Sequence, residues 1–246
     1  MIVLQKGFVN RNGKEFKNIT NVCLSGDYPF MEFGKFVHES KDNLATSLAD
    51  SGFNELGGVY IYMSGYNSKI ALRVYKDMFD YKFTHYRDDE LVSKLQDIQK
   101  EVKLTDFPTG IVSVEGHVIG QEIPYYHDAI SITEAIIAEK LKDSPIKYYK
   151  KILDILIELQ QNGVQYIDVH GKNFMYLEKE DKIKLIDFDD KYLTFDCPCG
   201  YKNMIQNLKK FIKNMNGLNN IKTPKILENT ETLEDVYEVI LNKTFK

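Results

Sequence analysis

Alternating and clustered apolar positions in the first half of the chain predict β-strands. Val59–Met63 and Ile70–Tyr75 are rich in β-branched and aromatic residues, and polar turn residues separate them. This pattern is typical of a β-hairpin. Ile111–Val114 and Val118–Ile119, on either side of another short polar turn, predict a second hairpin. The first 50 residues hold only short apolar pieces, and their structure stays open.

One helix is expected between the two hairpins. Apolar residues recur there at spacings of four, three and four, which places them on a single face of a helix: Leu91, Leu95, Ile98 and Val102. Asp88 and Asp89 are suitable residues for its first turn. The spacing therefore predicts a helix over residues 88–102.

The second half of the chain changes to a helical pattern. Ser131 and Glu134 have the spacing of a capping box before Ala135–Leu141. Residues 146–161 carry the strongest apolar stripe of the chain, and Asn162-Gly163 supplies a stop signal.

The remaining elements complete the expected fold class. Short strands are predicted at Phe174–Leu177 and Ile183–Phe188, and helices at Tyr201–Met215 and Leu233–Leu241. A β-rich first half followed by a helical second half indicates an α+β protein with two lobes.

Composition limits the classes of function. The chain has 246 residues, 43% of them hydrophobic, and a net charge of −4. No apolar run is long enough for a bilayer span, and the first residues lack the apolar core of a signal peptide, so we expect a cytoplasmic protein without membrane partners. A mildly acidic chain also argues against nucleic acid as a partner.

Three cysteines are too few for a disulfide framework. Cys197-Pro198-Cys199 is one residue tighter than the usual zinc knuckle, and no histidine lies near it in sequence. We interpret it as a reduced pair at a turn, with metal binding as the alternative.

The segment after the long helix carries the most informative polar residues. Asp168 is followed by Asn173, and Asp187 comes at the end of an apolar strand. The first carboxylate can orient a hydroxyl and accept its proton, while Asn173 and Asp187 can hold Mg²⁺ against nucleotide phosphates. The alternative is that Asp168 and Asn173 only make turn hydrogen bonds.

These motifs resemble the protein kinase-like superfamily. Asp168 to Asn173 matches the D-x-x-x-x-N of the catalytic loop, and Asp187-Phe188-Asp189 matches the DFG motif with Asp in place of Gly. The resemblance implies a two-lobed fold with a small β-rich N-lobe, one main helix and a short, mostly helical C-lobe. Its expected domains are an extension of unclear structure, an N-lobe and a C-lobe, over residues 1–50, 51–124 and 125–246.

The resemblance extends to the nucleotide-binding half. Gly57-Gly58 looks like a remnant of the glycine-rich loop, and Glu122 falls in the segment where the hinge between lobes should be. A nucleotide cleft between the lobes is the implied ATP site. A glycine pair before a strand is also typical of a simple turn.

Arg73 stands where the family has a phosphate-binding lysine, in Ile70-Ala71-Leu72-Arg73. A guanidinium holds phosphate differently from an ammonium group, so the exchange is not conservative. Lys76 is the alternative contact if the strand contains a bulge. The acid that should pair with this cation is Glu90 or Asp88 on the expected helix.

His170 and Lys172 are candidates for contact with the transferred phosphate. Asp-Val-His-Gly-Lys-Asn is similar to the D-x-H-x-x-N of aminoglycoside and choline kinases. The His-Arg of the family's HRD motif is missing, because Tyr166 stands two residues before Asp168. The family's A-P-E segment is also absent, and residues 194–200 occupy its place without matching it.

The resemblance implies an ATP- and Mg²⁺-dependent phosphotransferase. The leading expectation is an atypical serine/threonine protein kinase, with Asp168, His170 and Lys172 as catalytic residues. The alternatives are a small-molecule kinase acting on a hydroxyl-bearing substrate and a nucleotide-binding pseudokinase.

Overall fold

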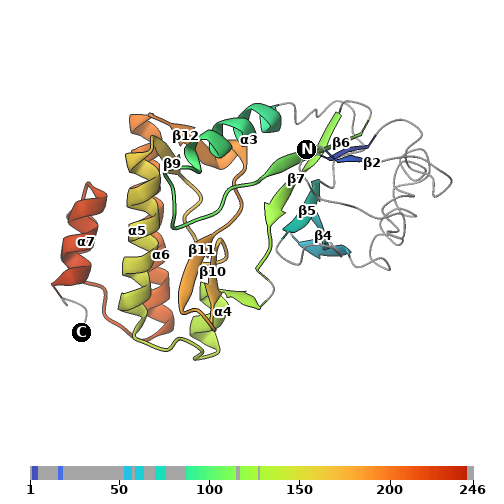
Figure 1. The fold of residues 1–246 in the computed structure, drawn as a ribbon. Coiled ribbons are helices and arrows are strands. Elements are labelled where there is room, and N and C mark those ends of the chain that lie inside the picture. The colour runs from blue at the N-terminus through green and yellow to red at the C-terminus, as the bar shows by residue number, and fades with distance from the viewer. Residues whose placement is uncertain are drawn as a thin grey trace. The chain divides into compact units, whose positions relative to one another are not determined.

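The computed structural model describes strands at residues 2–4, 16–18, 53–56, 59–63 and 70–75, and then residues 87–114, 117–126 and 128–242. The chain divides into two compact units, Met1–Asp97 with Phe107–His127, and Ile98–Asp106 with Asp128–Lys246. Helices and strands are mixed along the chain (Figure 1), which confirms the α+β class.

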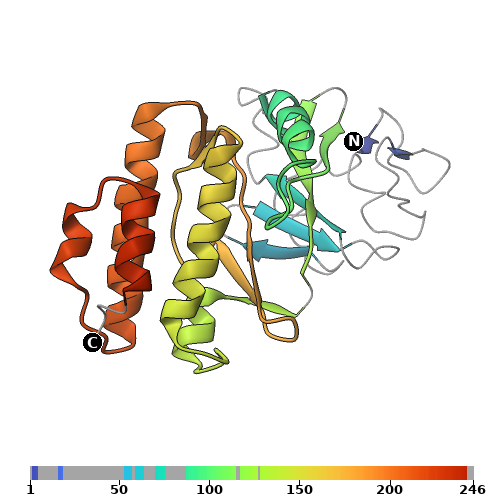
Figure 2. The same cartoon turned by 60° about the vertical axis from the view of Figure 1, so that its left-hand side comes forward.

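The first unit contains one sheet. Its described strands are β1 (Ile2–Leu4), β2 (Phe16–Asn18), β3 (Phe53–Leu56), β4 (Val59–Met63), β5 (Ile70–Tyr75), β6 (Gly110–Val114) and β7 (His117–Pro124). They are hydrogen-bonded in the order β2-β1-β6-β7-β5-β4-β3, and only the pairing of β1 with β6 is parallel among them. Strands β3, β4 and β5 lie side by side in Figure 2. Both predicted hairpins, β4–β5 and β6–β7, are confirmed.

The predicted helix of this half is α3 (Arg87–Ile98). Leu91 and Leu95 are buried as the spacing requires, and Ile98 of the same stripe is half-buried. Val92 is also buried and packs with Ile111 of β6. The helix ends at Ile98, so the expected continuation to residue 102 is wrong.

The second unit has a helix in each region where the sequence pattern predicted one, although the first of them ends at Ile137 and not at Leu141. The helices are α4 (Ile132–Ile137), α5 (Pro145–Gln161), α6 (Pro198–Leu218) and α7 (Leu233–Leu241), with 3₁₀ turns at Asp190–Tyr192 and Lys225–Asn229. The capping box of Ser131 and Glu134 is confirmed at the start of α4. In α5, the hydroxyl of Ser144 accepts a hydrogen bond from the Ile146 amide, and Pro145 occupies the first turn.

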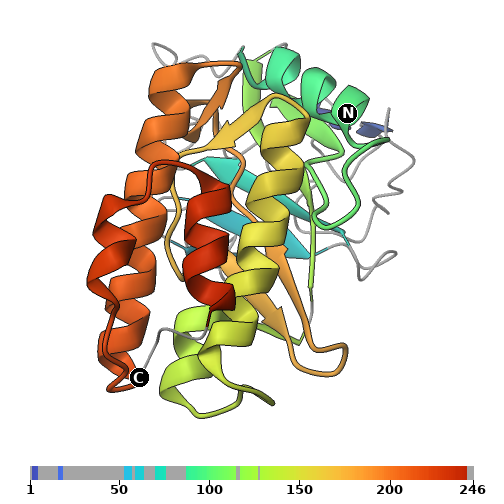
Figure 3. The same cartoon turned by 90° about the vertical axis from the view of Figure 1, so that its left-hand side faces the viewer.

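The apolar stripe of α5 forms the centre of the second unit's core. Its buried residues recur at helical spacing and are Tyr148, Tyr149, Ile152, Leu153, Ile155, Leu156 and Leu159. Helix α7 packs against α5 (Figure 3). After α5 the chain turns at Gly163, whose φ of 76° suits glycine, and enters a strand.

Two small sheets complete the second unit. One contains β8 (Ala129–Ser131), β10 (Phe174–Leu177) and β11 (Lys182–Leu185) in the order β11-β10-β8, and the other pairs β9 (Val164–Tyr166) with β12 (Leu193–Phe195). All of these pairings are antiparallel. The predicted strand at Phe174–Leu177 is confirmed, and the strand that pairs with it covers Lys182–Leu185, so it does not continue to Phe188 as expected.

Helix α6 starts earlier than the sequence pattern indicated. Cys197 is its N-cap residue and Pro198 its first residue, so the expected turn at the cysteine pair is wrong. Among the described residues, no helix combines the length and the apolar character needed to cross a bilayer.

Candidate active site

The candidate catalytic residues lie on the loop between β9 and β10. The loop is held at its start because the Ile167 amide donates to the Tyr192 carbonyl at 2.8 Å, and the Ile167 carbonyl accepts from Asn207 Nδ2 of α6 at 2.8 Å. Gly171 packs so closely on α4 that a Cβ atom there would lie 2.1 Å from Thr133 Oγ1. The path of the loop is thus fixed from both sides.

Asp168 and Asn173 are joined directly. Asn173 Nδ2 donates to Asp168 Oδ2 at 2.9 Å and to the Asp168 carbonyl at 3.1 Å. Both partners are acceptors, which identifies the amide nitrogen and leaves Oδ1 of Asn173 as the other end of the group. These bonds also close the loop, so Asn173 has a structural role whatever it binds.

His170 contacts the same carboxylate. Its Nε2 lies 3.1 Å from Asp168 Oδ2, while its Nδ1 accepts from the Lys172 amide at 3.2 Å. An acceptor at Nδ1 places the proton of a neutral ring on Nε2, which then donates to Asp168. The side chains of His170 and Lys172 are both exposed, and 24% of the Asp168 side chain is accessible.

Tyr166 lies beneath this group and connects it to the segment of Asp187. Its hydroxyl accepts from Asn173 Nδ2 at 2.7 Å and donates to the carbonyls of Ile186 at 3.0 Å and Asp187 at 3.3 Å. Burial, together with the negative charges of Asp187 and Asp168, raises the pKa of the Tyr166 hydroxyl well above its ordinary value. The hydroxyl therefore keeps the proton that it donates.

Asp187 follows the end of β11 in an unusual backbone conformation. Its φ of 69° is left-handed, at a cost of about 1 kcal/mol for a residue other than glycine. The Ile186 amide donates to the Asn173 carbonyl at 2.9 Å, and Thr105 Oγ1 donates to the Leu185 carbonyl at 3.0 Å. These bonds hold the strand end beside Asn173.

The structure therefore brings Asp168, Asn173 and Asp187 together from two loops. Carboxylate and amide oxygens are the donors that Mg²⁺ prefers, and it usually takes one or two protein ligands with phosphate and water as the others. The donor set of Asn173 and Asp187 fits this requirement. Groups of three or more His, Cys, Asp or Glu side chains suited to a metal do not occur among the described residues.

The first unit carries the candidates for nucleotide binding. Arg73 on β5 is half-buried and pairs in register with Gln121 of β7. Glu122 is buried, and its carboxylate accepts from the Thr109 hydroxyl. The Gln121 side chain is completely buried, and neither end of its amide has a hydrogen-bond partner.

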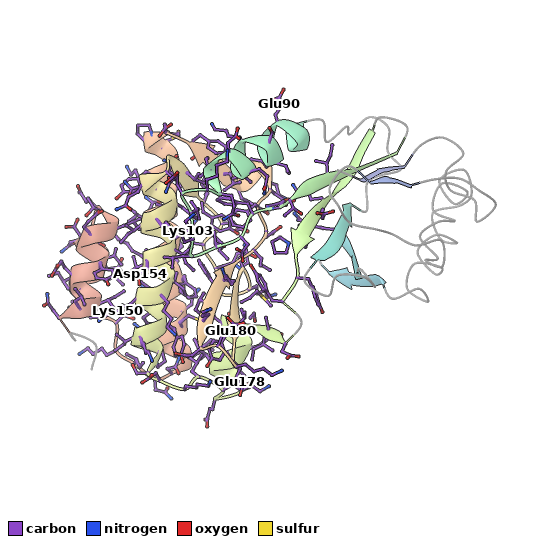
Figure 4. All side chains as sticks on the ribbon, viewed as in Figure 1. Glu90, Lys103, Lys150, Asp154, Glu178 and Glu180 are labelled. Atoms are coloured by element: carbon purple, nitrogen blue, oxygen red, sulfur yellow. The ribbon has the colours of Figure 1, made fainter. Side chains whose placement is uncertain are left out.

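The other candidates of this unit are less informative. Glu90 is exposed and projects outward from α3 (Figure 4). The alternative acid, Asp88, is placed on the same helix, but its side chain lies outside the described residues. Gly57, Gly58 and Lys76 also lie outside them.

Several positioning residues escaped the sequence analysis. Tyr166 was noted only for the histidine that it replaces, although a tyrosine at a strand end directly before Asp168 is a usable signal. Asn207 bonds Ile167, which is 40 residues away in sequence, and Thr105 bonds Leu185, which is 80 residues away. No local pattern marks such partners.

Comparisons with known proteins add no family or relative to this description of the site. Neither the scan against protein-family models nor the search of curated proteins found a match.

Proposed function

We propose that the chain is an ATP- and Mg²⁺-dependent phosphotransferase that transfers the γ-phosphate to a serine or threonine hydroxyl of a protein. The observation that carries the proposal is the grouping of Asp168, Asn173 and Asp187, tied together by the Tyr166 hydroxyl. The resemblance of the sequence motifs to those of protein kinases is the reason for assigning phosphate transfer to this group of residues.

In this proposal the two oxygens of Asp168 have separate tasks. Oδ2 is held by Asn173 and His170, so Oδ1 is the oxygen that orients the acceptor hydroxyl and receives its proton. A positioned general base of this kind contributes about 10²- to 10⁴-fold to a rate. Asp168 is accessible enough for a substrate hydroxyl to reach it.

Asn173 and Asp187 would hold the metal through their side-chain oxygens. When bound, Mg²⁺ neutralises charge on the phosphates, and ATP supplies the transferred group. Fixing both residues before the substrate binds lowers the cost of positioning, which is the main requirement of phosphoryl transfer.

Arg73 is assigned to the α- and β-phosphates by the resemblance, and Glu122 to the segment that binds the nucleotide. The unpartnered Gln121 amide beside Glu122 offers hydrogen-bonding capacity on the same strand. A buried amide without a partner costs about 1–3 kcal/mol, so a ligand or water that satisfied it would be favoured.

A small-molecule kinase is the second candidate, because His170 contacts Asp168 as a D-x-H sequence would allow. Both candidates use the same catalytic residues and differ in the acceptor.

The test is transfer of labelled phosphate from ATP, with Mg²⁺, into a fractionated cell extract. A protein kinase puts label into the protein fraction, and a small-molecule kinase puts it into the low-molecular-weight fraction. A nucleotide-binding pseudokinase would transfer nothing but would be stabilised against heat by Mg-ATP. If no label enters either fraction, the proposed phosphotransferase activity is wrong, and if Mg-ATP also gives no stabilisation, the proposed nucleotide site is wrong as well.

A further inference from the structure

Two cysteine side chains meet at the start of α6, apart from the residues assigned to phosphate transfer. Cys197 and Cys199 are both free thiols, and their Sγ atoms are 2.7 Å apart. A disulfide bond has an S–S distance of about 2.0 Å, so the two sulfurs are within a short movement of covalent contact.

The backbone around the pair is fixed in this position. The Cys197 amide donates to Oε1 of the buried Gln165 at 3.1 Å, and the Cys197 carbonyl accepts from the Tyr201 amide at 3.1 Å. Pro198, the first residue of the helix, restricts the backbone between the two cysteines. Forming a bond between the sulfurs therefore requires side-chain rotation rather than refolding.

The first turn of α6 is also packed tightly against β12. A Cβ atom at Gly200 would lie 1.8 Å from Thr194 Oγ1, so the helix start has no room to move towards that strand. The hydroxyl of Thr194 also donates to Gln165 Oε1, the acceptor used by Cys197. Both thiols keep contact with solvent, since Cys199 is exposed and Cys197 is half-buried.

The two thiols differ in reactivity. A hydrogen bond from the Cys199 thiol, aided by backbone N–H groups of the first turn, lowers the pKa of Cys197. The same hydrogen bond raises the pKa of Cys199, which keeps the shared proton. Cys197 is also the N-cap residue of α6, where the positive end of the helix favours a thiolate, so Cys197 is assigned the first attack and Cys199 the second.

We propose that Cys197 and Cys199 form a redox-active dithiol that a low-molecular-weight disulfide oxidises to an intramolecular disulfide. The Cys197 thiolate attacks one sulfur of the oxidant and expels the first thiolate. Cys199 then transfers its proton to that thiolate, attacks the Cys197 sulfur and expels a second thiolate. The protein loses two electrons and one proton, and the oxidant becomes one thiol and one thiolate.

The full chain is incubated with glutathione disulfide, blocked with an alkylating reagent and digested with trypsin. The tryptic peptide of residues 192–202 contains both cysteines of the pair, whereas Cys23 falls in a different peptide. The expected product is peptide 192–202 lighter by two hydrogen atoms, without alkylation and without attached glutathione. Recovery of this peptide with both cysteines alkylated, or with glutathione on each, overturns the proposal.

Single substitutions test the order of attack. Cys199→Ser should stop at one glutathione attached to Cys197, because the second thiol is missing. Cys197→Ser should acquire glutathione on Cys199 about tenfold or more slowly than Cys199→Ser acquires it on Cys197. Equal rates for the two variants would show that neither thiol is activated and would contradict the assigned roles.

Discussion

At the scale of the residue, the Tyr166 hydroxyl connects Asn173 to the main chain that leads into Asp187. Its oxygen is the third acceptor of Asn173 Nδ2, and its proton serves the carbonyls of Ile186 and Asp187. The ring is buried and packs edge to face on Phe188 at 5.8 Å between centroids. This hydroxyl therefore joins the two candidate metal ligands through their side of the loop, in addition to the backbone bond from the Ile186 amide to the Asn173 carbonyl.

Tyr166→Phe removes this hydroxyl and keeps the ring. We expect unfolding in urea to show a loss of about 1–2 kcal/mol, because buried carbonyls lose their donor. The Mg²⁺ concentration needed for half-maximal phosphate transfer should rise severalfold, because Asn173 and Asp187 are less well positioned.

Tyr148→Phe is the matched control, since Tyr148 is an equally buried tyrosine whose hydroxyl bonds Asp181 Oδ1 at 2.7 Å. It should lose stability without changing the Mg²⁺ requirement. An unchanged Mg²⁺ requirement in Tyr166→Phe would mean that the hydroxyl has only a structural role.

At the scale of the element, helix α5 organises the second unit through two carboxylates. Near its C-terminal end, Glu158 accepts from the amides of Lys103 at 2.9 Å and Leu104 at 2.8 Å. Near its N-terminal end, Tyr148 and Lys151 bond Asp181 in the turn between β10 and β11. The helix thus holds both the segment that follows α3 and the hairpin that precedes Asp187.

Glu158→Gln weakens the first of these attachments. A carboxylate that accepts two backbone N–H bonds is about twice as strong an acceptor as a neutral amide, so we expect a loss of about 1–2 kcal/mol. Hydrogen exchange should accelerate at the Lys103 and Leu104 amides. Glu178→Gln, in an exposed position at the end of β10 (Figure 4), should change stability by less than about 0.5 kcal/mol. Equal effects of the two substitutions would contradict the role of Glu158.

Asp181→Asn tests the second attachment, and asparagine suits the left-handed φ of 52° there. Burial raises the pKa of the Asp181 carboxyl, but hydrogen bonds from Lys151 and Tyr148 outweigh it and hold the pKa below its ordinary value. A lowered pKa gives stabilisation that is complete above the unfolded-state pKa of about 3.9 and is lost as the pH falls below it. The variant should therefore be less stable by about 1–2 kcal/mol at neutral pH, and this difference should shrink in acid.

Urea unfolding at neutral and acidic pH measures this difference. Asp128→Asn, which breaks the exposed pair with Lys179, is the control and should cost less than about 0.5 kcal/mol at either pH. A difference between wild type and Asp181→Asn that does not change with pH would show that the charge of Asp181 is not responsible.

The sequence alone predicted those helices whose start, stop and apolar positions are neighbours along the chain. The stripe and stop residues of α5 predicted its extent closely, and the capping box at Ser131 predicted the start of α4. The start of α6 was missed although Pro198 is a recognised first-turn residue. That error came from treating the cysteine pair as a turn.

Elements that depend on distant partners could not be predicted. Strands β8, β9 and β12 have three residues each, and β9 pairs with a strand almost thirty residues later in sequence, as Gln165 and Thr194 show. The apolar spacing continues from Ile98 to Val102, but the helix ends at Ile98, and the amides of Lys103 and Leu104 donate to Glu158 and not to a further helical turn. Similarly, the strand before Asp187 ends early, because the carbonyls of Leu185 and Ile186 accept hydrogen bonds from the side chains of Thr105 and Tyr166.

At the scale of the whole molecule, each compact unit carries a separate part of the candidate chemistry. The second unit holds the grouped residues Asp168, Asn173 and Asp187, and the first holds Arg73 with the buried Gln121 and Glu122. Motif spacing predicted the residues of the group because the resemblance supplied their order, while the supporting bonds required the fold.

Arg73→Ala tests the assignment of the first unit. We expect the ATP concentration for half-maximal transfer to rise about tenfold, the effect of losing one charge-assisted hydrogen bond to phosphate. Lys76→Ala should leave it unchanged, and Arg73→Lys should retain most of the activity. The reverse result, with Lys76→Ala alone impaired, would move the phosphate contact to Lys76.

The most direct test of the account is the rate of γ-phosphate transfer by Asp168→Asn compared with wild type in the presence of Mg-ATP. Asparagine keeps the shape of the side chain but cannot accept the proton of the acceptor hydroxyl, so we expect at least a 100-fold loss, about the lower limit for a general base. The control is Asp143→Asn, which changes an exposed aspartate that precedes α5 and pairs with Lys147; this variant should transfer phosphate at the wild-type rate. The account predicts loss of transfer only in Asp168→Asn, with both variants folded at the temperature of the assay. Equal transfer by Asp168→Asn and wild type would contradict it.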